Sequence, residues 1–103
     1  MFVTAGFPEP EVNAPVADAT GAWLAEGDLV WRQQRVVGEY QGEDHAVRRR
    51  RSEDAFRREL LTDHDWRVKE IWAEDVHRRP RRLATLLSFA RALDLDPATL
   101  RIA

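Results

Sequence analysis

The chain of 103 residues contains no cysteine. It therefore has no disulfide framework, no thiolate zinc site and no cysteine nucleophile, so any metal ion must take oxygen or imidazole ligands. A hard cation such as magnesium suits oxygen ligands best. There is no run of about 18 apolar residues to span a membrane, and the N-terminus lacks the basic-then-apolar pattern of a secretory signal. We therefore expect a soluble, cytoplasmic protein that does not bind membranes.

Basic residues are scarce in the first 45 positions, which hold only Arg32 and Arg35 against eight acidic residues. Residues 46–103 hold fourteen basic residues against ten acidic ones, and thirteen of the fourteen are arginines. This asymmetry fits an acidic pocket for a cation beside a basic surface for a polyanion, and it equally fits an uneven distribution of surface charge. Both interpretations stay open at the level of composition.

The chain has the length of one domain, and 44% of its residues are hydrophobic. We expect a single domain over residues 1–103, with a core at about 7–93. Extended runs, turn residues and helical periodicity predict strands at 11–17, 22–31, 35–40 and 66–72, and helices at about 50–63 and 80–93. These elements are expected to form one mixed sheet flanked by helices.

The apolar faces of the two expected helices follow from their three-four spacing. Ser52 is expected to cap the start of the first helix. Its apolar face is expected to hold Ala55, Phe56, Leu60 and Leu61. The face of the second is expected to hold Leu83, Leu86, Leu87, Ala90 and Leu93.

The second and third expected strands form a hairpin candidate. If this hairpin turns at residues 33–34, Val30 lies opposite Val37 and Asp28 lies opposite Glu39. Opposed like charges on a sheet cost up to about 1 kcal/mol, and burial beside valines raises that cost. A divalent cation between the two carboxylates would reverse the sign of their interaction. A longer turn would shift the register, so an exposed acidic pair on a solvated strand face is the alternative.

Gln41 shares a strand face with Glu39, because side chains alternate along a strand. Gly42 follows and is expected to mark a tight turn or a close approach of the backbone to a neighbouring group. His45 leads into the first expected helix. Taken alone, a histidine in this position is more often structural or exposed than catalytic.

Segments of the chain follow one another in an order and spacing that resemble a known family. They are Asp28-Leu29-Val30-Trp31, Glu39-Tyr40-Gln41-Gly42-x-x-His45, Asp54-x-x-Arg57-x-x-x-Leu61, and Trp66-x-Val68 followed by Asp75-Val76. Together they resemble the PD-(D/E)XK nuclease superfamily, and within it the subgroup related to very-short-patch-repair endonucleases. That subgroup is common in actinobacteria as the C-terminal part of longer, sometimes antitoxin-like proteins. The resemblance covers residues from about 7 to 93.

The resemblance implies an α/β fold with a restriction-endonuclease-like mixed central sheet of about four strands, flanked by helices in the order β-β-β-α-β-α. Such a core usually opens with a helix before the first strand, and that helix is expected to be missing here. The chain is therefore expected to be a shortened or N-terminally truncated form. A sheet face left uncovered would expose apolar surface, which favours a homodimer or a place within a larger host protein.

The resemblance also implies a magnesium-dependent endonuclease that hydrolyses DNA phosphodiester bonds, with Mn²⁺ as a substitute cation. Asp28 and Glu39 then correspond to the metal ligands, and the Tyr40 backbone carbonyl is a third candidate ligand. Gln41 takes the place of the residue that positions the attacking water, where the subgroup usually has aspartate. Glutamine cannot act as a general base, so proton transfer is expected to use a metal-bound hydroxide or His45 acting through water.

The arginine-rich segment before and within the first helix is expected to contact DNA phosphates through its side chains. These candidates are Arg48, Arg49, Arg50, Arg51 and Arg57, and for residues 48–51 the alternative is a flexible solvated loop. Arg57 either pairs with Asp54 on the same helix face or reaches back to the site. The tryptophans are expected to pack in the core and on the sheet faces rather than to stack on bases.

Three functions stay open on this basis. The first is a DNA endonuclease domain. The second is a catalytically inactive nuclease-fold module that binds nucleic acid or a protein partner, and the third is an antitoxin-like packing module of a larger assembly. The sequence leaves open which DNA is recognised, whether RNA is accepted, and the oligomeric state.

Overall fold

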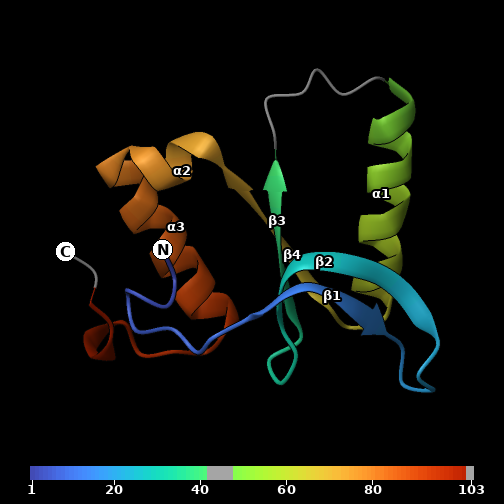
Figure 1. The fold of residues 1–103 in the computed structure, drawn as a ribbon, viewed down its shortest axis with the longest axis horizontal. Coiled ribbons are helices and arrows are strands. Elements are labelled where there is room, and N and C mark those ends of the chain that lie inside the picture. The colour runs from blue at the N-terminus through green and yellow to red at the C-terminus, as the bar shows by residue number, and fades with distance from the viewer. Residues whose placement is uncertain (42–47, 102–103) are drawn as a thin grey trace.

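A computed structural model describes residues 1–41 and 48–101 of the chain, and side chains in the second range from residue 52 onward. The structure is α/β, and its elements succeed one another from the N- to the C-terminus (Figure 1). They are β1 (Glu11–Ala17), β2 (Trp23–Trp31), β3 (Val36–Gln41), α1 (Arg48–Asp63), β4 (Arg67–Trp72), α2 (Ala73–His77), α3 (Arg79–Ala92) and the short 3₁₀ helix η1 (Pro97–Thr99). The expected order β-β-β-α-β-α is confirmed, with α2 as an addition.

The strands form one mixed sheet in the order β1-β2-β3-β4. Neighbours β1, β2 and β3 pair antiparallel, as short hairpin connections allow, whereas β4 pairs parallel to β3 after the α1 crossover. The sheet therefore has two edge strands, β1 and β4. Pro15 lies on the edge strand β1, where its missing N–H interrupts no central ladder.

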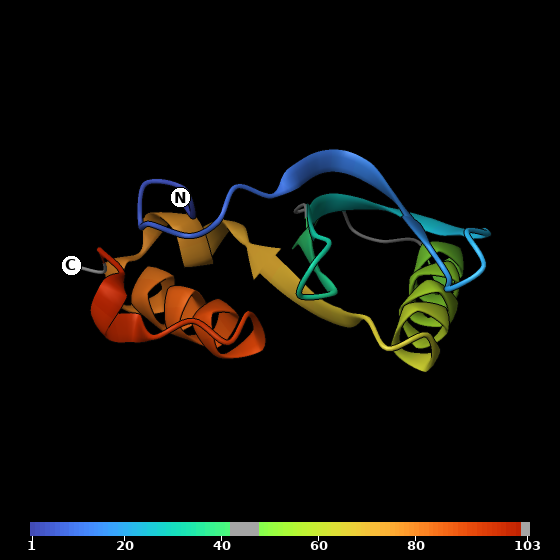
Figure 2. The same cartoon turned by 90° about the horizontal axis from the view of Figure 1, so that it is seen from below.

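The two faces of the sheet carry separate hydrophobic clusters, because side chains alternate along each strand. Val30 and Val37 point to the face covered by α1, where they pack with the fully buried Leu61. Trp31 points to the opposite face, where it packs against Phe89 of α3. Figure 2 shows β4 crossing between α1 and α3 at the side of the sheet away from β1.

The N-terminal segment covers part of the α3-side face in place of a helix. Among the described residues, no helix precedes β1. Instead, Phe2, Ala5 and Phe7 are buried in the same cluster as Trp31. The rings of Phe2 and Trp31 meet edge to face at a centroid distance of 5.1 Å, a favourable aromatic arrangement. This part of the sheet is therefore covered by the segment before β1 rather than by a helix.

Four side chains that were expected in the apolar interior or at a helix cap lie elsewhere. Helix α1 begins at Arg48, so Ser52 lies inside the helix and is not its cap. Ala55 and Phe56 are exposed, Phe56 to 67%, because α1 turns the side with Leu61 toward the sheet. Leu83 on α3 is 39% exposed for the same kind of reason: Leu86 and Phe89 face the sheet instead.

The tryptophans divide into two pairs. Trp31 and Trp66 are buried, as expected, whereas Trp23 and Trp72 are exposed, at the start of β2 and the end of β4. The expectation of packed tryptophans was therefore wrong for these two. None of the helices in the described ranges is long and apolar enough to cross a membrane.

Candidate functional site

The hairpin between β2 and β3 has the register that the sequence predicts. Val30 pairs with Val37, and Trp31 pairs with Val36. A turn at residues 32–35 connects the strands, and Arg35 closes it in the left-handed conformation with φ of 59°. The turn has four residues where the sequence predicts two, but both are centred between residues 33 and 34. The residues that pair across the hairpin are therefore the same.

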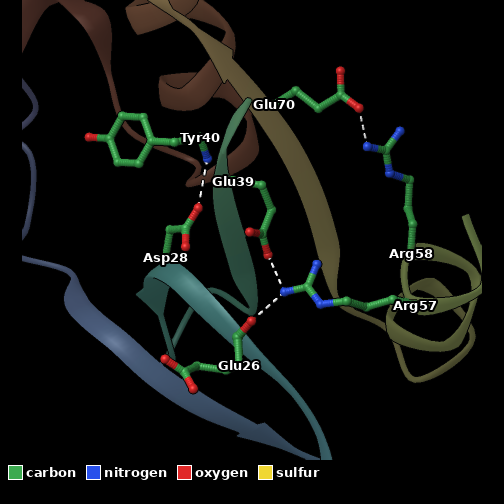
Figure 3. Close-up of polar contacts among 7 residues, drawn as sticks. All are labelled: Glu26, Asp28, Glu39, Tyr40, Arg57, Arg58 and Glu70. Atoms are coloured by element: carbon green, nitrogen blue, oxygen red, sulfur yellow. Dashed lines mark hydrogen bonds and ion pairs between the residues drawn. The ribbon is translucent and has the colours of Figure 1, made fainter. Parts of the chain in front are cut away.

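Asp28 lies at the β3 side of β2, where the ladder between the two strands ends. The backbone N–H of Tyr40 donates a hydrogen bond to Oδ2 of Asp28 at 2.8 Å (Figure 3). The side chain thus bridges β2 to β3 beyond the last backbone pair. This contact fixes the Asp28 carboxylate close to Glu39, as the hairpin parity predicts.

Glu39 is the buried acid of this group. Its side chain is 12% exposed, and it forms an ion pair with the guanidinium group of Arg57 on α1. The same Arg57 nitrogen also donates to the backbone carbonyl of Glu26 on β2 (Figure 3). Arg57 therefore ties α1 to both strands of the hairpin. Of the two partners proposed for Arg57 from the sequence, it takes the one in the site.

Burial raises the pKa of the Glu39 carboxyl above its ordinary value. The hydrogen bond and the positive charge of Arg57 act in the opposite direction, and the nearby Asp28 carboxylate adds to the rise. The ionised form of Glu39 is therefore disfavoured mainly by burial, and Arg57 offsets part of that cost. A cation at the Asp28–Glu39 pair would favour the ionised form further.

A second acid and arginine pair lies beside the first. Glu70 of β4 is the parallel-strand partner of Glu39, so both side chains point to the α1 side of the sheet. Arg58, the neighbour of Arg57 on α1, forms an ion pair with Glu70. Consecutive arginines on one helix thus each bind a carboxylate on a different strand.

Glu39, Arg57 and Arg58 border an open pocket of about 280 Å³ between α1 and the sheet, whereas Asp28 and Glu70 are not among its lining residues. Gln41 lines this pocket together with Glu39 and Arg57. His45 lies outside the described residues. So do the side chains of Arg48, Arg49, Arg50 and Arg51, whose backbone forms the first turn of α1.

The donor set available to a cation is small. No group of three or more His, Asp or Glu side chains suited to a metal ion occurs among the described residues. Asp28 and Glu39 provide two carboxylates on one face. Magnesium commonly keeps several waters and binds proteins through one or two carboxylates together with substrate phosphates. The pair fits that mode of binding, although Arg57 occupies one carboxylate oxygen of Glu39.

Sequence reasoning missed Glu26, Arg58 and Glu70. Glu26 takes part through its backbone carbonyl, which accepts from Arg57, so the alternation of side chains along the strand gives no signal for it. The place of Glu70 depends on the pairing of β4 with β3, which no local pattern encodes. The role of Arg58 could not be predicted without that of Glu70, because the position of β4 decides which arginine of α1 meets a carboxylate.

Replacing Arg57 with methionine is expected to destabilise the fold by about 1–3 kcal/mol, because Glu39 would keep a buried charge without its partner. Without Arg57 the pKa of Glu39 should rise further, since the arginine lowers it. Protonation removes the unpaired charge, so the loss should be greatest above the Glu39 pKa and shrink as the pH falls through it. Urea unfolding at several pH values measures this dependence.

The double variant Arg57→Met/Glu39→Gln is the control, because it removes the charge together with its partner. It should recover most of the stability lost in Arg57→Met. If both variants are equally unstable at neutral pH, the cost comes from lost packing of the arginine stem and not from the ion pair.

Comparison with known proteins finds two longer relatives in Mycobacterium tuberculosis. These are the "Uncharacterized protein Rv2248" of strain H37Rv and the "Uncharacterized protein MT2308" of strain CDC 1551. Each is 32% identical over 95 residues, which are 91% of this chain and 34% of the relative. The chain therefore spans about a third of the length of the curated relatives it matches. No family model and no solved structure matches the chain.

Proposed function

We propose that this chain is a restriction-endonuclease-like domain that binds a divalent cation, Mg²⁺ or Mn²⁺, at Asp28 and Glu39 and hydrolyses DNA phosphodiester bonds. The observation that carries the proposal is the proximity of the Asp28 and Glu39 carboxylates at the hairpin, with Arg57 and an open pocket beside Glu39. The strand-strand-strand-helix-strand-helix order supports it, because it is the order that the resemblance to PD-(D/E)XK nucleases implies.

The chemistry assigned to the chain's own residues follows from their places. Asp28 and Glu39 hold the cation, which polarises water and offsets the charge that develops on the phosphate oxygens. Gln41 borders the same pocket as Glu39 and orients water with its side-chain amide. Arg57 donates hydrogen bonds in this pocket, and a guanidinium group suits a phosphate as well as a carboxylate.

DNA binding is assigned to phosphate contacts from the arginine-rich start of α1 and from Arg57. Helix α1 begins with four successive arginines. Its N-terminal backbone N–H groups add donors for an anion. Contacts of this kind hold the backbone of DNA without reading its bases, so binding should weaken steeply as salt is raised.

One observation favours a second candidate function. Arg57 already neutralises Glu39, and Gln41 stands where a general base would act. An ion pair of this kind completes the site without a cation. A catalytically silent domain that binds nucleic acid or a protein partner has the same geometry, and only activity separates it from the nuclease.

Nicking of supercoiled plasmid tests the proposal. The purified chain should convert supercoiled to open-circular plasmid with Mg²⁺ or Mn²⁺ and leave it intact in EDTA. Isothermal calorimetry with MgCl₂, without DNA, should show heat of binding. Absence of nicking with either cation at low salt, from a chain that calorimetry shows to bind the metal, would identify the silent module.

A further inference from the structure

The outer edge of β4 offers backbone donors that the sheet does not use. Among residues 1–41 and 48–101, β4 pairs with β3 alone, so every second N–H of this strand points away from the ladder. The pattern is visible at two positions: Arg67 donates to the Arg35 carbonyl at 2.9 Å, whereas Trp72 donates outward, to Asp75 at 2.8 Å. By the same alternation, the N–H groups of Val68 and Glu70 face outward.

Three cations gather along this edge, on the side of the sheet opposite Glu39. Lys69 lies over the ring of Phe89, with its ammonium 5.8 Å from the ring centroid. Arg67 donates to the Ala92 carbonyl at the end of α3 at 3.2 Å, and Arg91 lies in the last turn of the same helix. Within the described residues, none of the three cations forms an ion pair with a carboxylate.

The three positive charges act on one another. Desolvation lowers the pKa of the Lys69 ammonium, and the charges of Arg91 and Arg67 lower it further. A site in which like charges are held together gains from an anion that neutralises them. The carboxylates nearby do not serve this purpose, because Glu70 is paired with Arg58 and Asp75 with Arg81.

Two open pockets of about 320 and 500 Å³ adjoin at this edge and share Lys69 and Ser88 in their walls. The larger is also lined by Thr62 and Trp66. Trp66 is 4% exposed, and its indole Nε1 has no hydrogen-bond partner in the described part of the chain. The hydroxyl groups of Ser88 and Thr62 thus accompany the cations in the wall of the larger pocket.

We propose that this basic edge of β4, defined by Arg67, Lys69 and Arg91, is a second binding site that takes phosphodiester groups of a nucleic-acid backbone. Cations with hydroxyl and backbone donors are the groups that hold phosphate in such complexes. All three cations line the larger pocket, and Lys69 also lines the smaller one, so the cations form a continuous edge that suits neighbouring phosphates of one backbone. The choice of nucleic acid as the polyanion rests on the proposed function; the site itself is separate from the Asp28–Glu39 pair.

Charges on an edge strand also prevent two sheets from pairing edge to edge. Preventing edge-to-edge pairing needs exposed charge only. Phosphate binding predicts in addition that the affinity for DNA falls as salt is raised, and that the slope depends on these residues. The test is the affinity of a fluorescein-labelled DNA duplex, measured by anisotropy in EDTA at a series of NaCl concentrations. EDTA prevents cleavage, so binding is measured without the proposed activity.

The variant Lys69→Gln/Arg91→Gln should bind DNA more weakly, and the slope of log affinity against log salt should fall by about 0.9 for each lost phosphate contact. The control Arg79→Gln/Arg101→Gln removes the same charge from exposed arginines that do not line the pockets. It should keep the wild-type slope. Equal behaviour of the two double variants would overturn the proposal.

Folding and ligand source have their own readouts. Arg91→Gln alone changes an exposed residue and should fold as the wild type does, which thermal unfolding checks; it should lose one contact. Inorganic phosphate tests the ligand source. If it raises the unfolding temperature of the wild type but not that of Lys69→Gln/Arg91→Gln, while both proteins bind DNA equally, the site takes a single phosphate and the nucleic-acid assignment is overturned. DNA binding that depends on this edge, without plasmid nicking under Mg²⁺, would contradict the nuclease and leave this site standing.

Discussion

Replacing Phe89 with alanine is expected to lower the free energy of unfolding by about 3–5 kcal/mol, the usual cost of truncating a fully buried aromatic side chain. Phe89 has no exposed surface, and its ring lies 4.7 Å from that of Phe2 and 5.6 Å from that of Trp31, centroid to centroid. It also fills the space next to Gly38, where an added Cβ would come within 3.4 Å of the ring. The loss is a large part of the stability of a small domain.

Phe56 provides a matched control in the same chain. It is also a phenylalanine on a helix, but it is 67% exposed. Phe56→Ala should therefore change the free energy of unfolding by less than about 0.5 kcal/mol. Urea titrations of both variants, followed by circular dichroism, measure the difference. Similar losses in the two variants would mean that α1 packs through Phe56 and that its orientation on the sheet is wrong.

Local patterns predicted the strands and the hairpin well. β1 has the predicted bounds, and β2 begins one residue later than predicted, because alternation and turn residues act over short stretches. The opposition of Val30 and Val37 followed from the hairpin alone, since two strands joined by a short turn have few possible registers.

The buried helix faces were harder to predict, and the reason is physical. Periodicity gives the spacing of apolar positions, but where apolar residues occur on several sides it does not say which side meets the sheet. On α1, the predicted face included Phe56, whereas the buried side holds Leu61 together with the charged Arg57. An arginine that pairs with a buried carboxylate occupies a place that hydrophobic patterning assigns to an apolar residue.

The same distinction applies to the candidate site. Asp28 and Glu39 could be placed together from the hairpin because their pairing is local. Glu70 could not, because it reaches Glu39 only through the parallel pairing of β4 with β3 across the α1 crossover. Such long-range pairing depends on packing of the whole domain rather than on residues next to one another in the sequence.

Asp28→Asn and Glu39→Gln should each reduce magnesium-dependent plasmid nicking by at least about a hundredfold, since loss of even an outer-shell partner of a metal ligand costs about 10–100-fold. Both substitutions keep the shape of the side chain. Asparagine retains an oxygen that can accept the Tyr40 N–H, and glutamine retains one that can accept from Arg57. What each variant loses is the negative charge that would hold the cation, so the fold should persist while activity disappears.

Glu11→Gln is the matched control, because Glu11 is also a strand carboxylate paired with an arginine. Arg32 contacts it at 2.7 Å, but both side chains are about half exposed and lie on the far edge of the sheet. Its nicking rate should equal that of the wild type.

Nicking by Asp28→Asn and Glu39→Gln at the wild-type rate would show that the activity belongs to another site or to a contaminant. Loss in Glu39→Gln alone would mean that Asp28 acts through its bond to the Tyr40 N–H, as a brace of the hairpin rather than as a metal ligand.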